Sequence, residues 1–153
     1  MVTPTTPIEQ HPDLVEMRMR YDAAAQMPTV QVLEGCSFLV GLYVAASPWI
    51  AGFAGLTPLA VNNFIIGGTM AFLAFAFAAA YGRTHGIAWV VPVLGFWTMI
   101  APWVVSGEVD TTRSIASNVI AGALALLLGL ATTALAMRGA AVAAGQGRRL
   151  GRR

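Results

Sequence analysis

Residues 35–82 read GCSFLVGLYVAASPWIAGFAGLTPLAVNNFIIGGTMAFLAFAFAAAYG, a run of 48 residues without a single Asp, Glu, Lys or Arg. A bilayer core about 30 Å thick is crossed by roughly 20 apolar residues in a helix, so this run is long enough for two membrane spans. Gly52, Gly55 and the Thr57-Pro58 pair near its middle are typical of a turn followed by a helix start. The run therefore predicts a hairpin of two transmembrane helices.

Two further uncharged runs follow, at 84–107 and 114–137, and each has room for one span. The chain has 153 residues, of which 57% are hydrophobic and 10% are charged, whereas about a quarter are charged in a soluble domain. This composition excludes an ordinary soluble domain and predicts an all-α membrane protein with four transmembrane helices. The expected spans are residues 30–49, 58–80, 87–104 and 114–137.

The flanks of the spans are polar. Residues 1–12 are rich in Thr and Pro and predict an unfolded arm, because they offer little apolar surface to bury. From 13 to 27, apolar residues recur at helical spacing among charged ones, which predicts a short amphipathic juxtamembrane helix that ends before Pro28. The other flank, 139–153, is a basic tail.

The arginines predict the orientation, because cytoplasmic flanks collect basic residues. Arg113 is the only one that falls on one side of the four expected spans, and eight fall on the other. Both ends of the chain are therefore expected in the cytoplasm. The eight are Arg18, Arg20, Arg83, Arg138, Arg148, Arg149, Arg152 and Arg153.

The two halves of the apolar region repeat one another. Residues 40–49 align with 94–103 without a gap, and 63–67 align with 118–122 after one extra residue. Each unit has a span that ends in a small residue, Pro and Trp, and then a span with Asn and, four residues later, Gly. The first unit supplies Ser47, Pro48, Trp49, Asn63 and Gly67, and the second supplies Ala101, Pro102, Trp103, Asn118 and Gly122.

A unit of two spans returns the chain to the side on which it entered, so both units have the same orientation. The sequence thus predicts a four-helix bundle of two similar hairpins, related by an axis along the membrane normal. The expected regions are the cytoplasmic arm with its amphipathic helix (1–28), the first hairpin (29–81), the second hairpin (82–138) and the basic cytoplasmic tail (139–153).

Paired Ser-Pro-Trp and Ala-Pro-Trp motifs, each closing a span and followed by Asn-x-x-x-Gly, resemble those of the SPW repeat membrane proteins of bacteria. The resemblance covers about residues 30–137. It implies a multi-pass protein of the bacterial cytoplasmic (inner) membrane and assigns no activity. Ala101 replaces the serine in the second unit, which argues against a role that needs this hydroxyl in both units.

The repeated residues have structural interpretations. Trp49 and Trp103 suit the headgroup level at the outer ends of their spans. Asn63 and Asn118 are expected to hydrogen-bond to a neighbouring helix or to each other, because an unpaired amide inside a bilayer is unfavourable. Two stripes of small residues are expected to be helix-packing seams. They are Gly67, Ala71, Ala74 and Ala78, and Ala121, Ala125, Gly129 and Thr133.

An alternative interpretation of the outer end is a binding site for a lipid or quinone headgroup. Its frame would be the two Pro-Trp pairs, with further aromatic surface nearby. The residues are Pro48, Trp49, Pro102, Trp103, Tyr43 and Trp97.

Glu34 is the one acid within a span, and its equivalent in the second unit is Ala88. A carboxylate inside a span is a functional hypothesis, with proton relay or cation binding as the usual roles. Glu34 also lies only about 7 Å along the predicted helix, so it could instead reach interfacial water or pair with Arg83, His85 or Arg138. We carry both interpretations forward.

Catalytic motifs are absent from the sequence. His11 and His85 lie outside the spans, so a bis-histidine haem site is not expected, and Cys36 is alone. The sequence has no Cys-x-x-Cys, His-Glu-x-x-His or glycine-rich phosphate loop, and no base lies near a nucleophile within the spans. We therefore expect no enzyme activity, no cofactor and no metal site.

The favoured function is a non-catalytic membrane protein that acts as a scaffold or accessory subunit of a membrane complex. Its expected partners are membrane lipids and other membrane proteins or copies of itself, and no nucleic acid. The alternatives are a small proton- or cation-coupled transporter that uses Glu34, and the lipid or quinone module at the outer Pro-Trp ends.

The topology can be tested with reporters. Green fluorescent protein fused to either end of the chain is expected to fluoresce, because both ends are predicted in the cytoplasm, and the fusions should resist extraction of membranes with carbonate. Alkaline phosphatase fused at the same two places should be inactive. Activity of the phosphatase at one end, or release by carbonate, would contradict the predicted topology.

Overall fold

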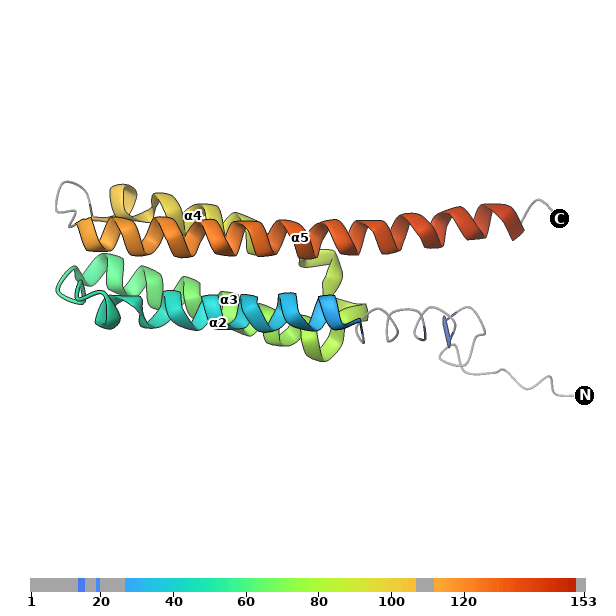
Figure 1. Ribbon diagram of the computed structural model, residues 1–153, viewed down its shortest axis with the longest axis horizontal. Coiled ribbons are helices and arrows are strands. Elements are labelled where there is room, and N and C mark those ends of the chain that lie inside the picture. Colours follow the sequence, from blue (N-terminus) through green and yellow to red (C-terminus); the bar gives the residue numbers. More distant parts are fainter. Residues whose placement is uncertain (1–13, 16–18, 20–26, 107–111, 151–153) are drawn as a thin grey trace, which may run out of the picture.

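The computed structural model describes residues 14–15, 19, 27–106 and 112–150, and within these residues it contains helices and turns only. The helices that cross the bundle form two hairpins, joined by a short connection at one end (Figure 1). The elements are α2 (Pro28–Ile50), α3 (Thr57–Thr84), the 3₁₀ turn η2 (His85–Ile87), α4 (Val90–Val105) and α5 (Thr112–Leu150).

Each hairpin consists of two neighbouring helices in the sequence. Helix α2 packs along α3 and α4 packs along α5, and smaller contacts of α2 with α5 and of α3 with α4 join the pairs. The start of α2 lies at the same end of the bundle as the long extension of α5 (Figure 1). We call this the Glu34 end, and the opposite end, where α2 and α4 terminate, the Pro-Trp end.

The predicted fold class is confirmed: the described part of the chain is all-α, and its four long helices, α2 to α5, form two hairpins. Three segments are long and apolar enough to cross a membrane, namely Pro28–Ile50, Thr57–Ala79 and Thr112–Leu135. They agree with the predicted spans at 30–49, 58–80 and 114–137 to within two residues. The fourth helix, Val90–Val105, is apolar but has only 16 residues.

The predicted start of the third span at Ile87 is wrong, because Ile87 lies in η2 and α4 begins at Val90. The Val91 N–H donates to the Ala88 carbonyl at 3.3 Å, which is a turn. Pro92 then falls in the first turn of α4, where its missing N–H needs no partner. At 1.5 Å per residue, α4 is about 24 Å long, which is shorter than a bilayer core of about 30 Å.

The turn between α2 and α3 is compact. Gly52 has a φ of 76°, which favours glycine. The Phe53 N–H donates to the Pro48 carbonyl at 2.9 Å, and the Phe53 ring packs with Leu59 and Ala101 in a buried cluster. Since Ala101 belongs to α4, this cluster joins the two hairpins at the Pro-Trp end.

The start of α3 lies one residue before the expected position. The Ala60 N–H donates to the Leu56 carbonyl at 2.9 Å, so Thr57 is already the first helical residue. Pro58 follows in the first turn, where proline is tolerated.

Paired glycines bring the two backbones of each hairpin into contact. A Cβ atom on Gly41 would collide with the backbones of Gly67 and Ala71, and one on Gly67 would collide with that of Gly41. In the second hairpin, a Cβ atom on Gly122 would collide with the Gly95 carbonyl oxygen in the same way. These glycines hold equivalent positions in the sequence repeat, so a pair of glycines allows the close helix contact in both hairpins.

Helix α5 continues past the predicted end of the last span at Met137 and reaches Leu150, well beyond the start of α2 (Figure 1). The first part of the expected tail, to Leu150, is thus helical. The expected amphipathic helix at 13–27 lies largely outside the described residues. Of the expected arm, 14–15 and 19 are described as helical.

The glycine contacts can be tested by substitution. Gly67→Leu and Gly122→Leu should each lower the free energy of unfolding in detergent by about 1–3 kcal/mol or more, because the added side chain meets backbone. Gly68→Leu is the matched control, since nothing lies within 4 Å of the place of its Cβ atom. Denaturation with sodium dodecyl sulfate, followed by circular dichroism, measures the difference. Equal stability of the Gly67→Leu and Gly68→Leu variants would contradict the close approach.

Candidate functional site

At the end of α2, Ser47 makes a hydrogen bond in place of one that Pro48 removes from the helix. Pro48 has no N–H, so the Val44 carbonyl, four residues earlier, loses its usual helical donor. The Ser47 hydroxyl donates to that carbonyl instead, at 2.7 Å. The serine thus replaces the hydrogen bond that the proline removes.

The same hydroxyl also joins α2 to α3. Asn63 Nδ2 donates to Ser47 Oγ at 3.1 Å, and both side chains are 1% exposed. This is the bond to a neighbouring helix that the sequence predicts for Asn63. An amide and a hydroxyl shielded from solvent thereby become partners, as a bilayer interior requires.

The network continues from α3 to α4. Asn62 Nδ2 donates to Asn63 Oδ1 at 3.3 Å, and Trp97 Nε1 donates to Asn62 Oδ1 at 3.0 Å. Hydrogen bonds therefore run from Trp97 on α4, through the two asparagines on α3, to Ser47 on α2. The network joins the first hairpin to the second.

A second bond between the hairpins joins Tyr43 Oη on α2 and Ser117 Oγ on α5, at 3.2 Å. Tyr43 aligns with Trp97 in the repeat, and Asn62 aligns with Ser117. In each unit, the aromatic residue of the first helix therefore reaches the second helix of the other unit. We call these two contacts the cross-hairpin bonds.

Sequence reasoning missed the cross-hairpin bonds. From the sequence, Tyr43 and Trp97 are expected only as aromatic surface for a lipid or quinone, and Asn62 and Ser117 have no predicted role. The repeat alignment contained the necessary signal, because it places an aromatic donor at both 43 and 97 and a polar residue just before both repeat asparagines.

The second unit differs at the serine. With Ala101 at that position, Asn118 Nδ2 donates to the Ser114 carbonyl of its own helix at 2.9 Å. Asn118 Oδ1 is buried and has no hydrogen-bond partner among the described residues. The expectation that Asn118 pairs with a neighbouring helix or with Asn63 is therefore wrong, because alanine offers no hydroxyl.

The two Pro-Trp pairs divide between the inside and the outside of the bundle. Pro48 and Pro102 are fully buried, whereas Trp49 and Trp103 are 63% and 50% exposed. The Trp49 ring meets Phe64 edge-on, with 6.3 Å between the ring centroids. Exposed indoles at helix ends suit the headgroup level. The lipid or quinone site at this end stays a prediction.

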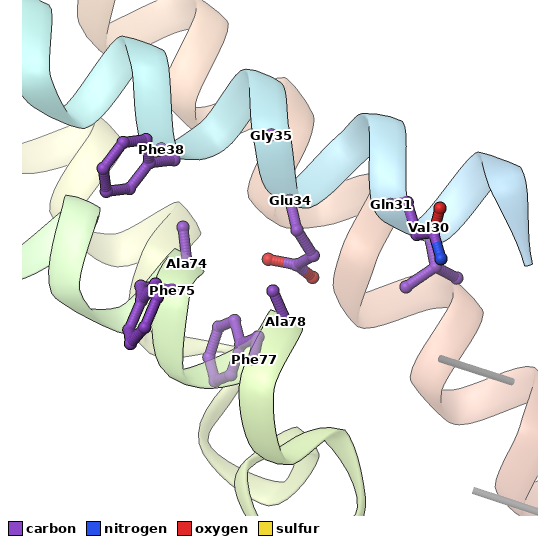
Figure 2. Close-up of a pocket in the computed structure, with 9 residues that line it drawn as sticks. All are labelled: Val30, Gln31, Glu34, Gly35, Phe38, Ala74, Phe75, Phe77 and Ala78. Atoms are coloured by element: carbon purple, nitrogen blue, oxygen red, sulfur yellow. The ribbon is translucent and has the colours of Figure 1, made fainter. Parts of the chain in front are cut away.

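Glu34 lies at the opposite end, on the face of α2 that packs against α3. Its side chain is 3% exposed, and Oε1 has no hydrogen-bond partner among the described residues. Figure 2 shows the carboxylate pointing from α2 toward α3, beside Ala78. It lines a pocket of about 410 Å³. The lining residues are Val30, Gln31, Glu34, Gly35, Phe38, Ala74, Phe75, Phe77 and Ala78.

The sequence suggests three ion-pair partners for Glu34, namely Arg83, His85 and Arg138. The side chains of Arg83 and His85 lie outside the described part of the structure, and Arg138 is exposed. Within the part of the chain that the structure describes, the buried carboxylate lies in a largely apolar pocket with aromatic rings nearby. Such a group can hold a proton or attract a cation. Among the described residues, no three His, Cys, Asp or Glu side chains gather as metal ligands would.

Comparison with known proteins gives one match. The family model of the SPW repeat domain matches residues 31–132, a range that includes both Pro-Trp pairs, both repeat asparagines and Glu34. None of the curated proteins and none of the solved structures matches the chain.

The role of the serine can be tested by exchanging the two units' residues. Ser47→Ala should lower the free energy of unfolding by about 1–3 kcal/mol, because it leaves the Val44 carbonyl and the Asn63 amide unpaired. Ala101→Ser should raise it by about 0.6 kcal/mol, since the new hydroxyl can pair with Asn118. Denaturation in mixed micelles measures both changes.

The control for this exchange is Ala134→Ser, which adds a hydroxyl at an exposed position of α5 and should leave stability unchanged. A loss of stability in Ala101→Ser would contradict the role assigned to the serine.

Proposed function

The chain belongs to the SPW repeat family, and from this premise we propose that it is a non-catalytic accessory subunit or scaffold of the bacterial cytoplasmic membrane. In this role it packs against the transmembrane helices of other membrane proteins or of a second copy. Both ends of the chain face the cytoplasm, and no cofactor takes part.

The observation that carries the proposal is the outward face of α3. Gly68 is exposed on this face, and nothing lies within 4 Å of the place where its Cβ atom would be. Phe64 and Phe72, one turn to either side, are exposed by 58% and 69%. A glycine between two large rings forms a notch into which a partner helix fits, because small residues let helix backbones approach closely in lipid.

Gly67 and its neighbour Gly68 lie in different surroundings. The space beside Gly67 is filled by α2 of the same chain, whereas the space beside Gly68 is open. Within an apolar stretch of 18 residues in each of the three longest spans, only 28%, 33% and 39% of the residues are buried inside the chain. Most side chains of these spans are thus free to contact lipid or a partner.

The interior polar groups support a role without chemistry. The described bonds of Ser47, Asn62, Asn63 and Trp97 connect helices to one another. In membranes such bonds contribute about 0.6 kcal/mol each on average, so they set the register of the helices while packing holds the bundle together. Such a use of polar groups is expected of a protein that acts by packing against other helices.

The proposal predicts that Gly68→Leu weakens association without unfolding the chain. Extraction of native membranes with a mild detergent, followed by light scattering and mass spectrometry, should show a complex of the wild-type chain with another membrane protein or a second copy. The Gly68→Leu variant should lose most of that complex, because the new side chain fills the notch.

Ala134→Leu is the matched control, because it adds the same bulk at an exposed position of α5. It should keep the complex. A monodisperse monomer without partners in the wild type, or equal loss in the two variants, would contradict the proposal.

A further inference from the structure

The pocket at the Glu34 end has no part in the accessory role. We propose that it binds an organic cation with a hydrophobic body, with the charge against the Glu34 carboxylate and the body against Phe38, Phe75 and Phe77. This binding site is independent of the notch at Gly68, so either proposal can fail without the other.

The first support is the unpaired carboxylate. Glu34 is 3% exposed, and its Oε1 atom has no hydrogen-bond partner among the described residues. A buried charge is strongly unfavourable unless an opposite charge or hydrogen bonds compensate for it. Figure 2 shows that the carboxylate points into the space between α2 and α3, where a bound cation would supply the missing partner.

The second support is the size and lining of the pocket. A volume of about 410 Å³ lies within the range of about 300–1,000 Å³ that small-molecule sites occupy. Three phenylalanine side chains line it, and aromatic faces attract organic cations. A carboxylate beside aromatic rings suits an organic ammonium or phosphonium better than a neutral or anionic molecule.

The third support is the corresponding place in the second hairpin, which is closed. In the repeat, Glu34 corresponds to Ala88, Phe38 to Pro92 and Ala74 to Gly129. A Cβ atom on Gly129 would collide with the ring of Pro92, so α4 and α5 meet directly there. Ala88 is buried in a hydrophobic cluster. The contact between the two helices is therefore tightly packed in the second hairpin, which lacks the acid, and open in the first hairpin, beside Glu34.

The pocket can be reached from the side of the bundle. Gln31, Gly35 and Phe75 line it and are exposed at the surface. Glu34 lies six residues after Pro28, about 9 Å along the helix, which is close to the membrane surface in a spanning helix. An organic cation with an apolar body concentrates at that depth. Its source is either the ammonium headgroup of a lipid or a free lipophilic cation.

Isothermal titration calorimetry of the purified full chain in dodecyl maltoside tests the proposal. The probes are tetraphenylphosphonium and tetraphenylborate, which have nearly the same shape and opposite charges. Tetraphenylphosphonium should bind with saturation at one site, and tetraphenylborate should not. Glu34→Gln, which keeps the size of the side chain, should weaken the binding at least about tenfold.

A second pair of variants tests the pocket itself. Gly35→Leu keeps the acid but adds bulk at the rim, where nothing lies within 4 Å of the place of the Cβ atom, and should also abolish binding. Cys36→Leu adds bulk at the next position, which is exposed and does not line the pocket. It should bind as the wild type does. Circular dichroism confirms that each variant is folded.

Competition then identifies the source of the cation. Displacement of the probe by lysophosphatidylethanolamine, but not by lysophosphatidylglycerol, supports a lipid ammonium. Displacement by neither lipid supports a free cation. Equal binding of the two tetraphenyl ions, unchanged binding in Glu34→Gln, or equal displacement by both lipids would overturn the proposal.

Discussion

The backbone contact between the two helices of each hairpin is the constraint on which the rest of the structure depends. Lipid removes the hydrophobic drive between helices, so close packing must hold them together. At Gly41 and Gly67 the backbones of α2 and α3 touch, and any Cβ atom there would separate them. Only at this short separation do Ser47 and Asn63, nearer the Pro-Trp end, come within 3.1 Å. The Ser47–Asn63 hydrogen bond within the first hairpin thus depends on the glycine contact.

The two hairpins use one backbone plan, and two of the positions at which their side chains differ change the local contacts. Where the first unit has Ser47, the second has Ala101, and Asn118 consequently donates to its own helix. Where the first unit has Glu34 beside a pocket, the second has a buried Ala88. The first hairpin therefore carries the Ser47–Asn63 bond between its two helices and the pocket with its buried acid, whereas Asn118 of the second hairpin bonds within its own helix. The two halves thus share a fold, and these two differences give them different contacts.

Hydropathy and the repeat predicted the span limits and the hairpins, because span length depends only on bilayer thickness. They did not predict the features that depend on the geometry between helices. The start of α4 at Val90 depends on how η2 crosses from one hairpin to the other. The partners of Asn62 and Trp97 lie on different helices, so periodicity along one helix cannot find them. The pocket beside Glu34 is likewise invisible in sequence, because it depends on the distance between two faces.

The two ends of the first hairpin are held to different degrees. At the Pro-Trp end, Ser47 and Asn63 are bonded, and Phe53 packs with Leu59 and Ala101. At the Glu34 end, small residues leave the pocket open instead. Regions with fewer buried contacts open at lower free energy than the rest of a fold. The glycine contact lies between the two ends, so the pocket and the Ser47–Asn63 bond are separated along the hairpin.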